Sequence, residues 1–547
     1  MHNPEDRSFI GHPRGLGYLA FTEAWERFSY YGMQSLLVLY MVGRLLHPGH
    51  IERIAGFGLF RHLLESIYHG PLSVQALASA IFGLYTGLVY LTPIGGGLIA
   101  DRVLGRTRTV TLGALLMAAG HFLMAFDVTF LVALACLLTG VGCFKGNLAS
   151  QVGALYATGD NRRADAFQIY YIFINGGVIA APLIAGTLGE VYGWHYGFGA
   201  AGVGMLIGLT IYLSGRKWLP PDSPVVEKHE RAAKTKLTHR EKMAIIALIA
   251  LLPVLTIAVI GNQQIFNAYL VWAQDHANLI FFGRKMPTTW LITLDSIVSV
   301  SFLVAAVVFW RLWSKKFPEP AEITKIGIGS LVAVTGFISL AIGSAIAANL
   351  GTKVSIGWLI TFHVLNSIGF ANVFPVSLAL YARAAPAALS ATIIGIFYLH
   401  LFAANNLVGW IGGFLEKMPA THFWLLHAAL SGIAGIIFLV AGRLFGHLPR
   451  AKTKAARPPN SDLQRPPRSS TFYFFARSPF QLSAFRFSVF KAALCLPRRL
   501  LAKHFGVVRP LPDEGGTSGH CLESLASSRS NVFTSARTRR TSSVPEL

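Results

Sequence analysis

Three charged residues interrupt the first apolar stretch of the chain, in the segment Glu23-Ala-Trp-Glu-Arg-Phe-Ser-Tyr-Tyr31. Glu23, Glu26, Arg27, Tyr30 and Tyr31 are spaced so that they share one face of a helix. A charge at the middle of a bilayer costs at least ~2.5 kcal/mol, so such residues persist there only beside one another or a wet cavity. The spacing predicts a polar pathway within a membrane helix. The alternative is an interfacial cluster whose side chains reach the headgroups.

Lys145 is a further charge in an apolar setting, between Leu131–Leu138 and Asn147. An ammonium at that depth needs a carboxylate, and Glu23 or Glu26 is the expected partner. A Lys near a helix end that reaches the headgroups is the alternative. Burial and a nearby cation act in opposite senses on a carboxylate's affinity for protons, so this group of residues can bind and release a proton. Protonation would free the cation and bias an inward-open or outward-open state.

The composition predicts an all-α integral membrane protein. The 547 residues are 53% hydrophobic and 13% charged, and the mean hydropathy is +0.51. A spanning helix needs ~20 mainly apolar residues. Twelve stretches meet this expectation, in two groups of six. Their centres lie near Tyr31, Leu88, Leu116, Thr139, Ile179, Ile207, Val259, Ser301, Val334, Ser367, Leu399 and Ile433.

The formal net charge of +22 reflects topology rather than nucleic-acid binding. Seventeen Lys and Arg against five Asp and Glu follow Pro449, and most other positive charges lie in alternate loops. This positive-inside pattern predicts a multi-pass protein of the plasma or inner membrane with both termini in the cytoplasm. One loop, 44–73, carries positive charge on the nominally outer side. No cleavable signal peptide is expected, and the four cysteines lack metal-ligand or disulfide spacing.

Four segments follow from the hydropathy and charge. Residues 1–214 and 243–446 are predicted as six-helix halves, and 215–242 as a cytoplasmic linker with Pro220, Pro221 and Pro224. Residues 447–547 form a basic tail rich in Arg, Ser and Pro, predicted to be disordered. Two six-helix halves are the layout of the major facilitator superfamily, whose substrate site lies at the midplane. A gating loop of that superfamily is matched by Gly95-Gly-Gly through Asp101, Arg102 and Arg106, where glycines permit close helix approach and the charges form a cytoplasmic network.

The chain resembles the proton-dependent oligopeptide transporters, a family that imports di- and tripeptides. The most specific match is Glu23-x-x-Glu-Arg-Phe-x-Tyr-Tyr-Gly-Met33. Further matches are Gly11-His-Pro-Arg-Gly-Leu, Tyr85-x-x-x-x-Tyr90-Leu, Gly96-x-x-x-Ala-Asp-Arg102, Gly142-Cys-Phe-Lys145-Gly-Asn147, Tyr171-x-x-Ile-Asn175-x-Gly177 and Gly193-Trp-His-Tyr-Gly-Phe198. The resemblance is dense over residues 10–215, thinner over 240–445 and absent from the tail.

The resemblance implies roles for particular residues. Glu23, Glu26, Arg27 and Lys145 would couple protons to transport, with Glu23 and Glu26 as the carboxylates identified within the membrane. The peptide site would contain Arg27, Tyr31, Tyr90, Lys145, Asn175, Gln263 and Phe370. Each aromatic residue alone is also compatible with ordinary helix packing. Protons are the expected coupling ion, with no cofactor and no metal, and the protein is expected to be a monomer in contact with lipid.

The second half departs from the family. No Asp or Glu occurs between Met243 and Gln274, where the family has a glutamate. The family glutamate that receives the peptide's amino terminus falls at Phe370. In the first helix, a further family Arg falls at Gln34. Amide side chains peculiar to this half could substitute, although such groups also commonly join membrane helices. They are Asn262, Gln263, Gln264, Asn267, Asn366, Asn372, Asn405 and Asn406.

Three functions remain open on this reading. The first is a proton-coupled importer of di- and tripeptides, and the second is a proton-coupled transporter of another small organic solute on the same fold. The absent glutamates favour the second more than any other feature. The third is a membrane receptor with the tail as its output, for which no signalling domain is recognisable. An enzyme is not expected, because the glycine-rich stretch at Gly95 lacks the context of a nucleotide-binding loop.

Overall fold

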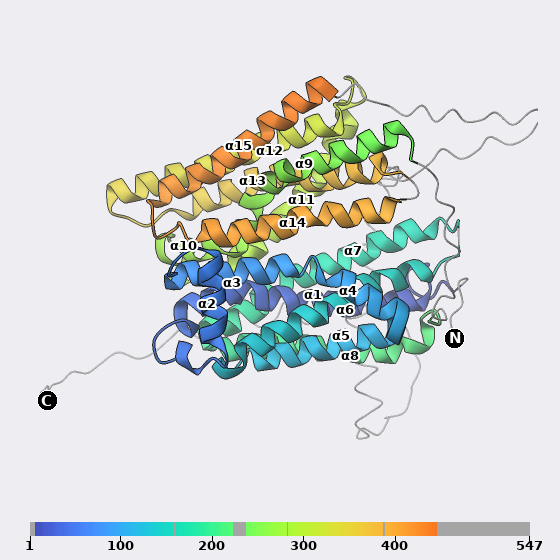
Figure 1. Ribbon diagram of the computed structural model, residues 1–547, viewed down its shortest axis with the longest axis horizontal. Coiled ribbons are helices and arrows are strands. Elements are labelled where there is room, and N and C mark those ends of the chain that lie inside the picture. Colours follow the sequence, from blue (N-terminus) through green and yellow to red (C-terminus); the bar gives the residue numbers. More distant parts are fainter. Residues whose placement is uncertain (1–5, 158, 223–236, 282, 387–388, 446–547) are drawn as a thin grey trace, which may run out of the picture. The chain divides into compact units, whose positions relative to one another are not determined.

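The computed structural model describes residues 6–157, 159–222, 237–281, 283–386 and 389–445. The predicted tail and half of the predicted linker lie outside these residues. Helices dominate the first part of the chain (Figure 1). Its elements are α1 (Arg14–Tyr40), η1 (Met41–Leu45), η2 (Ile51–Arg53), α2 (Phe57–Ile67), α3 (Val74–Leu88), α4 (Thr92–Ile99), η3 (Ala100–Leu104), α5 (Arg106–Leu123), η4 (Asp127–Thr129), α6 (Phe130–Ala154), α7 (Arg162–Ala181), η5 (Pro182–Gly186), η6 (Leu188–Tyr192), α8 (Trp194–Gly215) and η7 (Arg216–Trp218).

The second half begins with a well-capped helix and contains one short hairpin. Thr238 accepts a hydrogen bond from the backbone N–H of Glu241, whose carboxylate in turn accepts one from the Thr238 backbone, so α9 starts with a capping box. The elements are α9 (His239–Gln263), η8 (Gln264–Phe266), α10 (Ala268–His276), β1 (Ile280–Phe281), β2 (Arg284–Lys285), α11 (Trp290–Trp313), α12 (Glu322–Leu350), α13 (Ile356–Ala384), α14 (Ser390–Gly412) and α15 (Ala420–Phe445). Strands β1 and β2 pair antiparallel.

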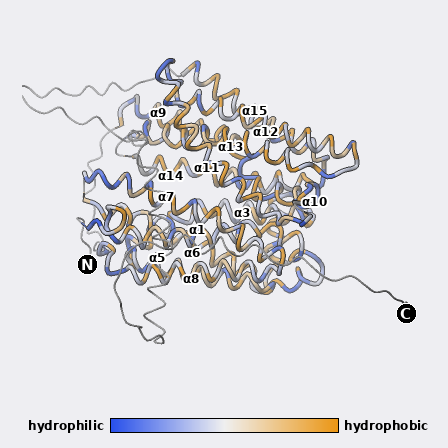
Figure 2. Tube along the Cα trace, turned by 180° about the vertical axis from the view of Figure 1, so that it is seen from behind, coloured by the Kyte–Doolittle hydropathy of each residue, from blue (hydrophilic) through white to orange (hydrophobic). Residues whose placement is uncertain are grey.

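Ten helical segments of the described chain are long and apolar enough to cross a membrane. Figure 2 shows hydrophobic residues along the helices and hydrophilic residues mainly at helix ends and in loops. The predicted spans centred on Tyr31 and Leu116 fall in α1 and α5, which are helical but not among the ten. Helix α1 carries Glu23, Glu26 and Arg27. The nearly all-helical membrane fold is therefore confirmed, whereas the count of twelve spans stays a prediction.

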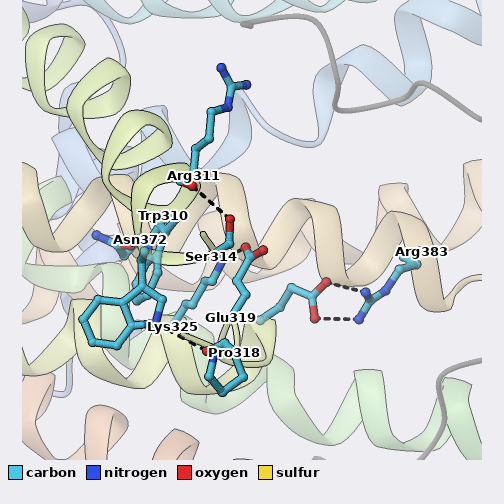
Figure 3. Close-up of polar contacts among 10 residues, drawn as sticks. Trp310, Arg311, Ser314, Pro318, Glu319, Lys325, Asn372 and Arg383 are labelled. Atoms are coloured by element: carbon cyan, nitrogen blue, oxygen red, sulfur yellow. Dashed lines mark hydrogen bonds and ion pairs between the residues drawn. The ribbon is translucent and has the colours of Figure 1, made fainter. Parts of the chain in front are cut away.

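Charged and indole side chains join the ends of α11, α12 and α13 (Figure 3). Lys325 pairs with Glu319, and its ammonium lies 4.6 Å from the centre of the Trp310 ring. The Trp310 indole N–H donates to Asn372 Oδ1 at 2.6 Å. Three helices of the second half are thus joined at one end by contacts that include a cation over an aromatic face.

The two halves touch most closely where α3 passes α14. A Cβ atom built on Gly83 would lie 2.5 Å from the carbonyl oxygen of Asn405 and 2.7 Å from the Cα of Gly409. A Cβ on Gly409 would lie 2.8 Å from the carbonyl oxygen of Ser79. No side chain fits at such distances, so paired glycines let the two backbones meet directly.

A carboxylate from the first half caps a helix of the second half. Glu190 in η6 accepts hydrogen bonds from the backbone N–H groups of Thr288 and Thr289, both at 2.8 Å, just before α11 begins. Nearby, the Trp290 indole donates to Thr187 Oγ1 at 2.8 Å. A negative charge is favourable at a helix N-terminus, where N–H groups lack partners. We call these contacts between 187–190 and 288–290 the clamp.

Hydrogen bonds between the halves are confined to one region. Besides the clamp, Thr289 and Thr293 donate to backbone carbonyls of Pro182 and Ile179, and Ser73 donates to Glu416. Within the described residues no other hydrogen bond or ion pair joins the two halves. Hydrogen bonding between the halves is therefore concentrated near the N-termini of α3 and α11.

Candidate functional site

The charged residues of α1 form a buried cluster. Glu23, Glu26 and Arg27 are 3%, 0% and 5% exposed, as expected for a polar group inside the protein rather than one at the lipid surface. Arg27 Nε lies 3.1 Å from Glu23 Oε1 and also pairs with Glu26. One guanidinium thus serves two carboxylates, leaving the trio with a net charge of −1 when both are ionised.

Helix α7 supplies a further partner to this cluster. The Tyr170 hydroxyl donates to Glu23 Oε2 at 2.7 Å. Close approach of α7 to α1 makes this contact possible, because Gly177 lies against the backbone carbonyl of Ala24, where a Cβ would collide. The glycine that the sequence motif places two residues after Asn175 therefore has a packing role.

Several polar atoms of the cluster lack a hydrogen-bond partner among the described residues. Both carboxylate oxygens of Glu26 and the Nη2 of Arg27 are buried in this state. Buried polar groups are normally satisfied, and the exceptions often mark sites that bind protons or ligands. Glu26 pairs with Arg27 and has no other polar partner among the described residues, so a proton on it would compete only with Arg27.

Lys145 does not form the expected ion pair in this structure. Its ammonium lies 5.4 Å from the centre of the Tyr90 ring. In the described part of the chain no carboxylate is within 4.0 Å of it. The reason is that Arg27, on the same helix as Glu23 and Glu26, already engages both. A cation over an aromatic ring is a weaker contact than a buried ion pair, so Lys145 is available to another anion.

Aromatic residues assigned to the peptide site meet aromatic residues of the second half. The Tyr31 ring lies 5.9 Å from that of Phe266, and the Tyr90 ring is stacked at 6.5 Å on that of Tyr398. The Tyr30 and Tyr31 rings touch edge to face. Arg27, Tyr31, Tyr90 and Lys145 are therefore brought to the boundary between the halves.

The remaining predicted site residues are less closely connected. Asn175 donates to the carbonyl of Tyr171 in its own helix at 2.8 Å. Gln263 is half-buried near the end of α9. Phe370 is stacked on Phe374 at 5.5 Å, so it belongs to an aromatic group within the second half. In the described part of the chain no hydrogen bond, ion pair or ring contact joins these three to the α1 cluster, and their substrate role stays a prediction.

The predicted gating loop shows close packing without a charge network. Gly96 lies against the backbone of Gly142 in α6, where a Cβ would collide, as the glycine-rich pattern predicts. Within the described residues Asp101, Arg102 and Arg106 form no ion pair. Instead Asp222 accepts hydrogen bonds from Thr107 near the start of α5. The expected network is therefore not formed here, because η3 leaves Asp101 and Arg102 exposed.

Two residues were missed by the sequence argument. Tyr170 is one, and its signal was a tyrosine adjoining the matched motif at Tyr171. The other is Asp295, which is 8% exposed within the apolar span Trp290–Trp313. Glu23 and Glu26 are thus not the only carboxylates inside the bundle. The signal for Asp295 was a carboxylate between apolar residues, but it lies outside the segment that matches the family glutamate.

The sequence pattern of the POT family matches residues 107–239 and 222–425. The chain belongs to the POT family. An uncharacterized transporter of Bacillus subtilis, YclF, is 29% identical over 494 residues, covering 80% of this chain and 93% of that protein. A di-/tripeptide transporter of Lactococcus lactis is 28% identical over 503 residues, covering 80% and 97%.

Solved structures of the POT family share this fold. The crystal structure of a mutant peptide transporter POT in complex with alafosfalin has a TM-score of 0.71 and 28% identity, covering 82% of this chain and 98% of that one. The relatives are transporters, which confirms that this POT family member is a multi-pass membrane transporter and not an enzyme. The family assigned from the sequence motifs is confirmed as well.

Proposed function

We propose that the chain is a proton-coupled symporter that imports di- and tripeptides. The observation that carries the proposal is the buried Glu23–Glu26–Arg27 cluster, in which an excess carboxylate is available for a proton. Relatives add support, since one is named a di-/tripeptide transporter and a related POT structure holds alafosfalin.

Coupling follows from competition for Arg27. While Glu23 and Glu26 are both ionised, Arg27 is held by two charges. A proton on one carboxylate removes one of these attractions and leaves the guanidinium able to pair with a substrate carboxylate. Lys145, which has no anionic partner here, is a second cation for the same group. Tyr31, Tyr90 and Asn175 supply neutral hydrogen-bonding groups for a peptide backbone.

Alternating access would separate the halves at one end while closing them at the other. With the basic loops on the cytoplasmic side, the clamp lies at the outer face, and both termini lie in the cytoplasm. The hydrogen bonds between the halves are all toward that face, which supports an inward-facing state for this structure. We place the protein, as a monomer, in the plasma or inner membrane.

Uptake into proteoliposomes tests the activity. Purified protein is reconstituted, an inward pH gradient is imposed, and a panel of labelled dipeptides is offered. Accumulation above the outside concentration that collapses when a protonophore is added is the expected result. If no dipeptide accumulates although the protein is correctly inserted, the proposal is wrong.

The coupling residues are tested by Glu23→Gln combined with Glu26→Gln. The double variant should lose the share of gradient-driven accumulation that the cluster carries, because no carboxylate remains there to take up its proton. Exchange of labelled for unlabelled substrate without a gradient should persist. Glu65→Gln, at a half-buried site on α2 in the loop after η1, is the control. Full gradient-driven uptake by the double variant would exclude Glu23 and Glu26 from coupling.

A second candidate function is transport of another small organic solute by the same route. Phe370 favours it, because this residue stands in an aromatic stack where the resemblance places an amine-binding glutamate. Competition separates the two candidates. Dipeptides should block uptake of a labelled dipeptide and free amino acids should not. A solute that competes at much lower concentration than any dipeptide would favour the second candidate.

A further inference from the structure

A chain of hydrogen bonds joins three buried side chains of the second half. Asp295 of α11 accepts from His363 Nδ1 of α13 at 2.9 Å. His363 Nε2 lies 2.8 Å from the Tyr269 hydroxyl of α10. His363 and Tyr269 are fully buried, and Asp295 is 8% exposed. The coupling scheme above uses none of the three, yet they place a carboxylate and an imidazole together inside the bundle.

Aromatic rings enclose this chain of side chains. The Tyr269 ring lies 5.3 Å from that of Phe362, 6.0 Å from Trp272 and 6.1 Å from Trp424. In the described residues no Lys or Arg pairs with Asp295, and His363 is its ion-pair partner. Among the described residues, the imidazole is therefore the one partner that could balance the charge of Asp295, by taking up a proton.

Other titratable groups on the packed elements are engaged elsewhere. The rings of His427 on α15 and His400 on α14 bond to carbonyls of their own helices. Glu190 accepts from the start of α11, and His276 lies over Trp272 at the end of α10. Lys325 of α12 pairs with Glu319. None of them is bonded to the imidazole, so the hydrogen-bond partners of the His363 ring are Asp295 and Tyr269.

Adding one proton rearranges this network without breaking it. With a neutral imidazole, His363 Nδ1–H donates to Asp295 and Nε2 accepts from the Tyr269 hydroxyl, for a net charge of −1. A proton on Nε2 reverses the second bond, so that Nε2–H donates to the Tyr269 oxygen, and the net charge becomes zero. Removing an unbalanced charge from a dry interior is favourable, and histidine is the side chain that most readily changes charge at physiological pH.

The network is also connected to the contacts between the halves. Thr293, two residues before Asp295, donates to the carbonyl of Ile179 in the first half at 3.0 Å. The start of α11 forms the clamp with Glu190. A movement that separates the halves at the clamp displaces α11, which carries Asp295. The distance between Asp295 and His363 of α13 then changes.

We propose that Asp295, His363 and Tyr269 form a second proton-binding site, separate from Glu23 and Glu26, that is loaded and emptied as the clamp opens and closes. The role in transport rests on the proposed proton-coupled function. It adds one proton to each transport cycle, carried by the half that lacks the family glutamates.

Proton binding is tested without any substrate. Infrared difference spectra of the full-length protein in lipid nanodiscs, with isotope-labelled histidine rings, are recorded between about pH 5 and pH 8. The chain has 18 histidines, so the signal of His363 is the part of the imidazolium band that His363→Gln removes from the wild-type spectra. That part should depend on pH and should be altered in Asp295→Asn. His427→Gln, which removes a buried imidazole bonded only to its own helix, is the matched control. Identical pH-dependent spectra in wild type and His363→Gln would overturn the proposal.

Coupling is tested by the equilibrium accumulation of a dipeptide in proteoliposomes. For a gradient of about one pH unit, loss of one proton per cycle lowers the accumulation ratio about tenfold. Asp295→Asn and Tyr269→Phe should show this loss, and His427→Gln should not. Tyr269→Phe keeps the ring packing, so it separates proton binding from misfolding. Wild-type accumulation in all variants would overturn the coupling role.

The two tests separate the proposals. If wild-type protein shows no gradient-driven uptake but the infrared band behaves as expected, the proposed function fails and the proton site stands. If uptake is gradient-driven but His363→Gln leaves the pH-dependent spectra unchanged, the proposed function stands and the proton site fails.

Discussion

Arg27 is the residue on which the site depends, because it neutralises only one of the two carboxylates that it contacts. Truncating it would leave two buried anions without a cation. Removing one partner of a buried ion pair costs about 3–5 kcal/mol, so Arg27 variants are expected to be unstable as well as inactive. The neighbouring tyrosine is the better probe of the same site, since its ring can be retained.

Tyr170→Phe removes one hydrogen bond to Glu23 and keeps the packing of the ring. A hydrogen bond to a charged group contributes about 1.5–3 kcal/mol, which corresponds to roughly one to two pH units in the profile of uptake. The pH at half-maximal uptake should move by at least one unit. Tyr171→Phe is the matched control, because that side chain is 49% exposed and the adjoining residue makes the contact. If uptake depends on pH in the same way in the two variants, Tyr170 has no role in proton binding at the cluster.

Phe370 stands where the resemblance places an amine-binding glutamate. Without a carboxylate at this position, an N-acetylated dipeptide should compete nearly as well as the free dipeptide. Phe370→Glu should restore a preference for the free amine of roughly 5- to 150-fold, equivalent to about 1–3 kcal/mol. Inhibition of uptake by matched free and acetylated dipeptides measures both. If acetylation weakens wild-type binding more than about tenfold, another group recognises the amine.

At the scale of the element, the start of α1 is joined to the end of α6 through His12. The His12 ring and the Tyr156 hydroxyl lie 2.9 Å apart and both are buried. Burial lowers the pKa of His12 below its usual value, although Asp165 acts in the opposite sense. His12 is therefore neutral in the folded protein at neutral pH.

Acidification should weaken this junction. Below the ordinary histidine pKa the unfolded chain takes up a proton that folded His12 does not, so the free energy of unfolding falls as the pH decreases through about 6.5. Above that pH the contribution is constant. His12→Gln should flatten the fall in melting temperature between about pH 7.5 and pH 5.5. The control is His62→Gln on α2, an exposed histidine. If melting temperature falls equally with pH in wild type and His12→Gln, His12 does not contribute to the pH dependence of stability.

The elements also show what the sequence could establish. Burial of Glu23, Glu26 and Arg27 and the close approach at Gly96 were predicted correctly, because helical spacing and glycine pattern are local properties. The partner of Lys145 was not predicted correctly, because the cation that pairs with a carboxylate is the one that lies nearest to it in the folded protein. Asp295 was missed for a similar reason: its meaning depends on His363, which lies 68 positions later in the chain.

For the whole molecule, the clamp should set the balance between the two open states. Glu190→Gln keeps the shape of the side chain and removes its charge from the N-terminus of α11. A charge in such a position contributes about 0.3–2 kcal/mol, so the population with separated halves should rise roughly 2- to 30-fold. Distances between spin labels on the loops after η1 and before α13 would report the change.

The control is Glu52→Gln in η2, whose carboxylate accepts from the backbone N–H of Gly49 and forms no hydrogen bond or ion pair with the second half among the described residues. It should leave the distances unchanged. Unaltered distances in Glu190→Gln would show that the halves are held together by other contacts, such as those of α3 with α14.

Those α3–α14 contacts leave no clearance at Gly83, where even one methyl group would press on the backbone at Asn405 and Gly409. An alanine at this position would act as a wedge, and the strain is relieved when the two backbones move apart. A substitution of the smallest kind can thus serve as a tool for structure determination, enriching the conformer opposite to the one described and making it accessible to imaging without a ligand or a binding antibody.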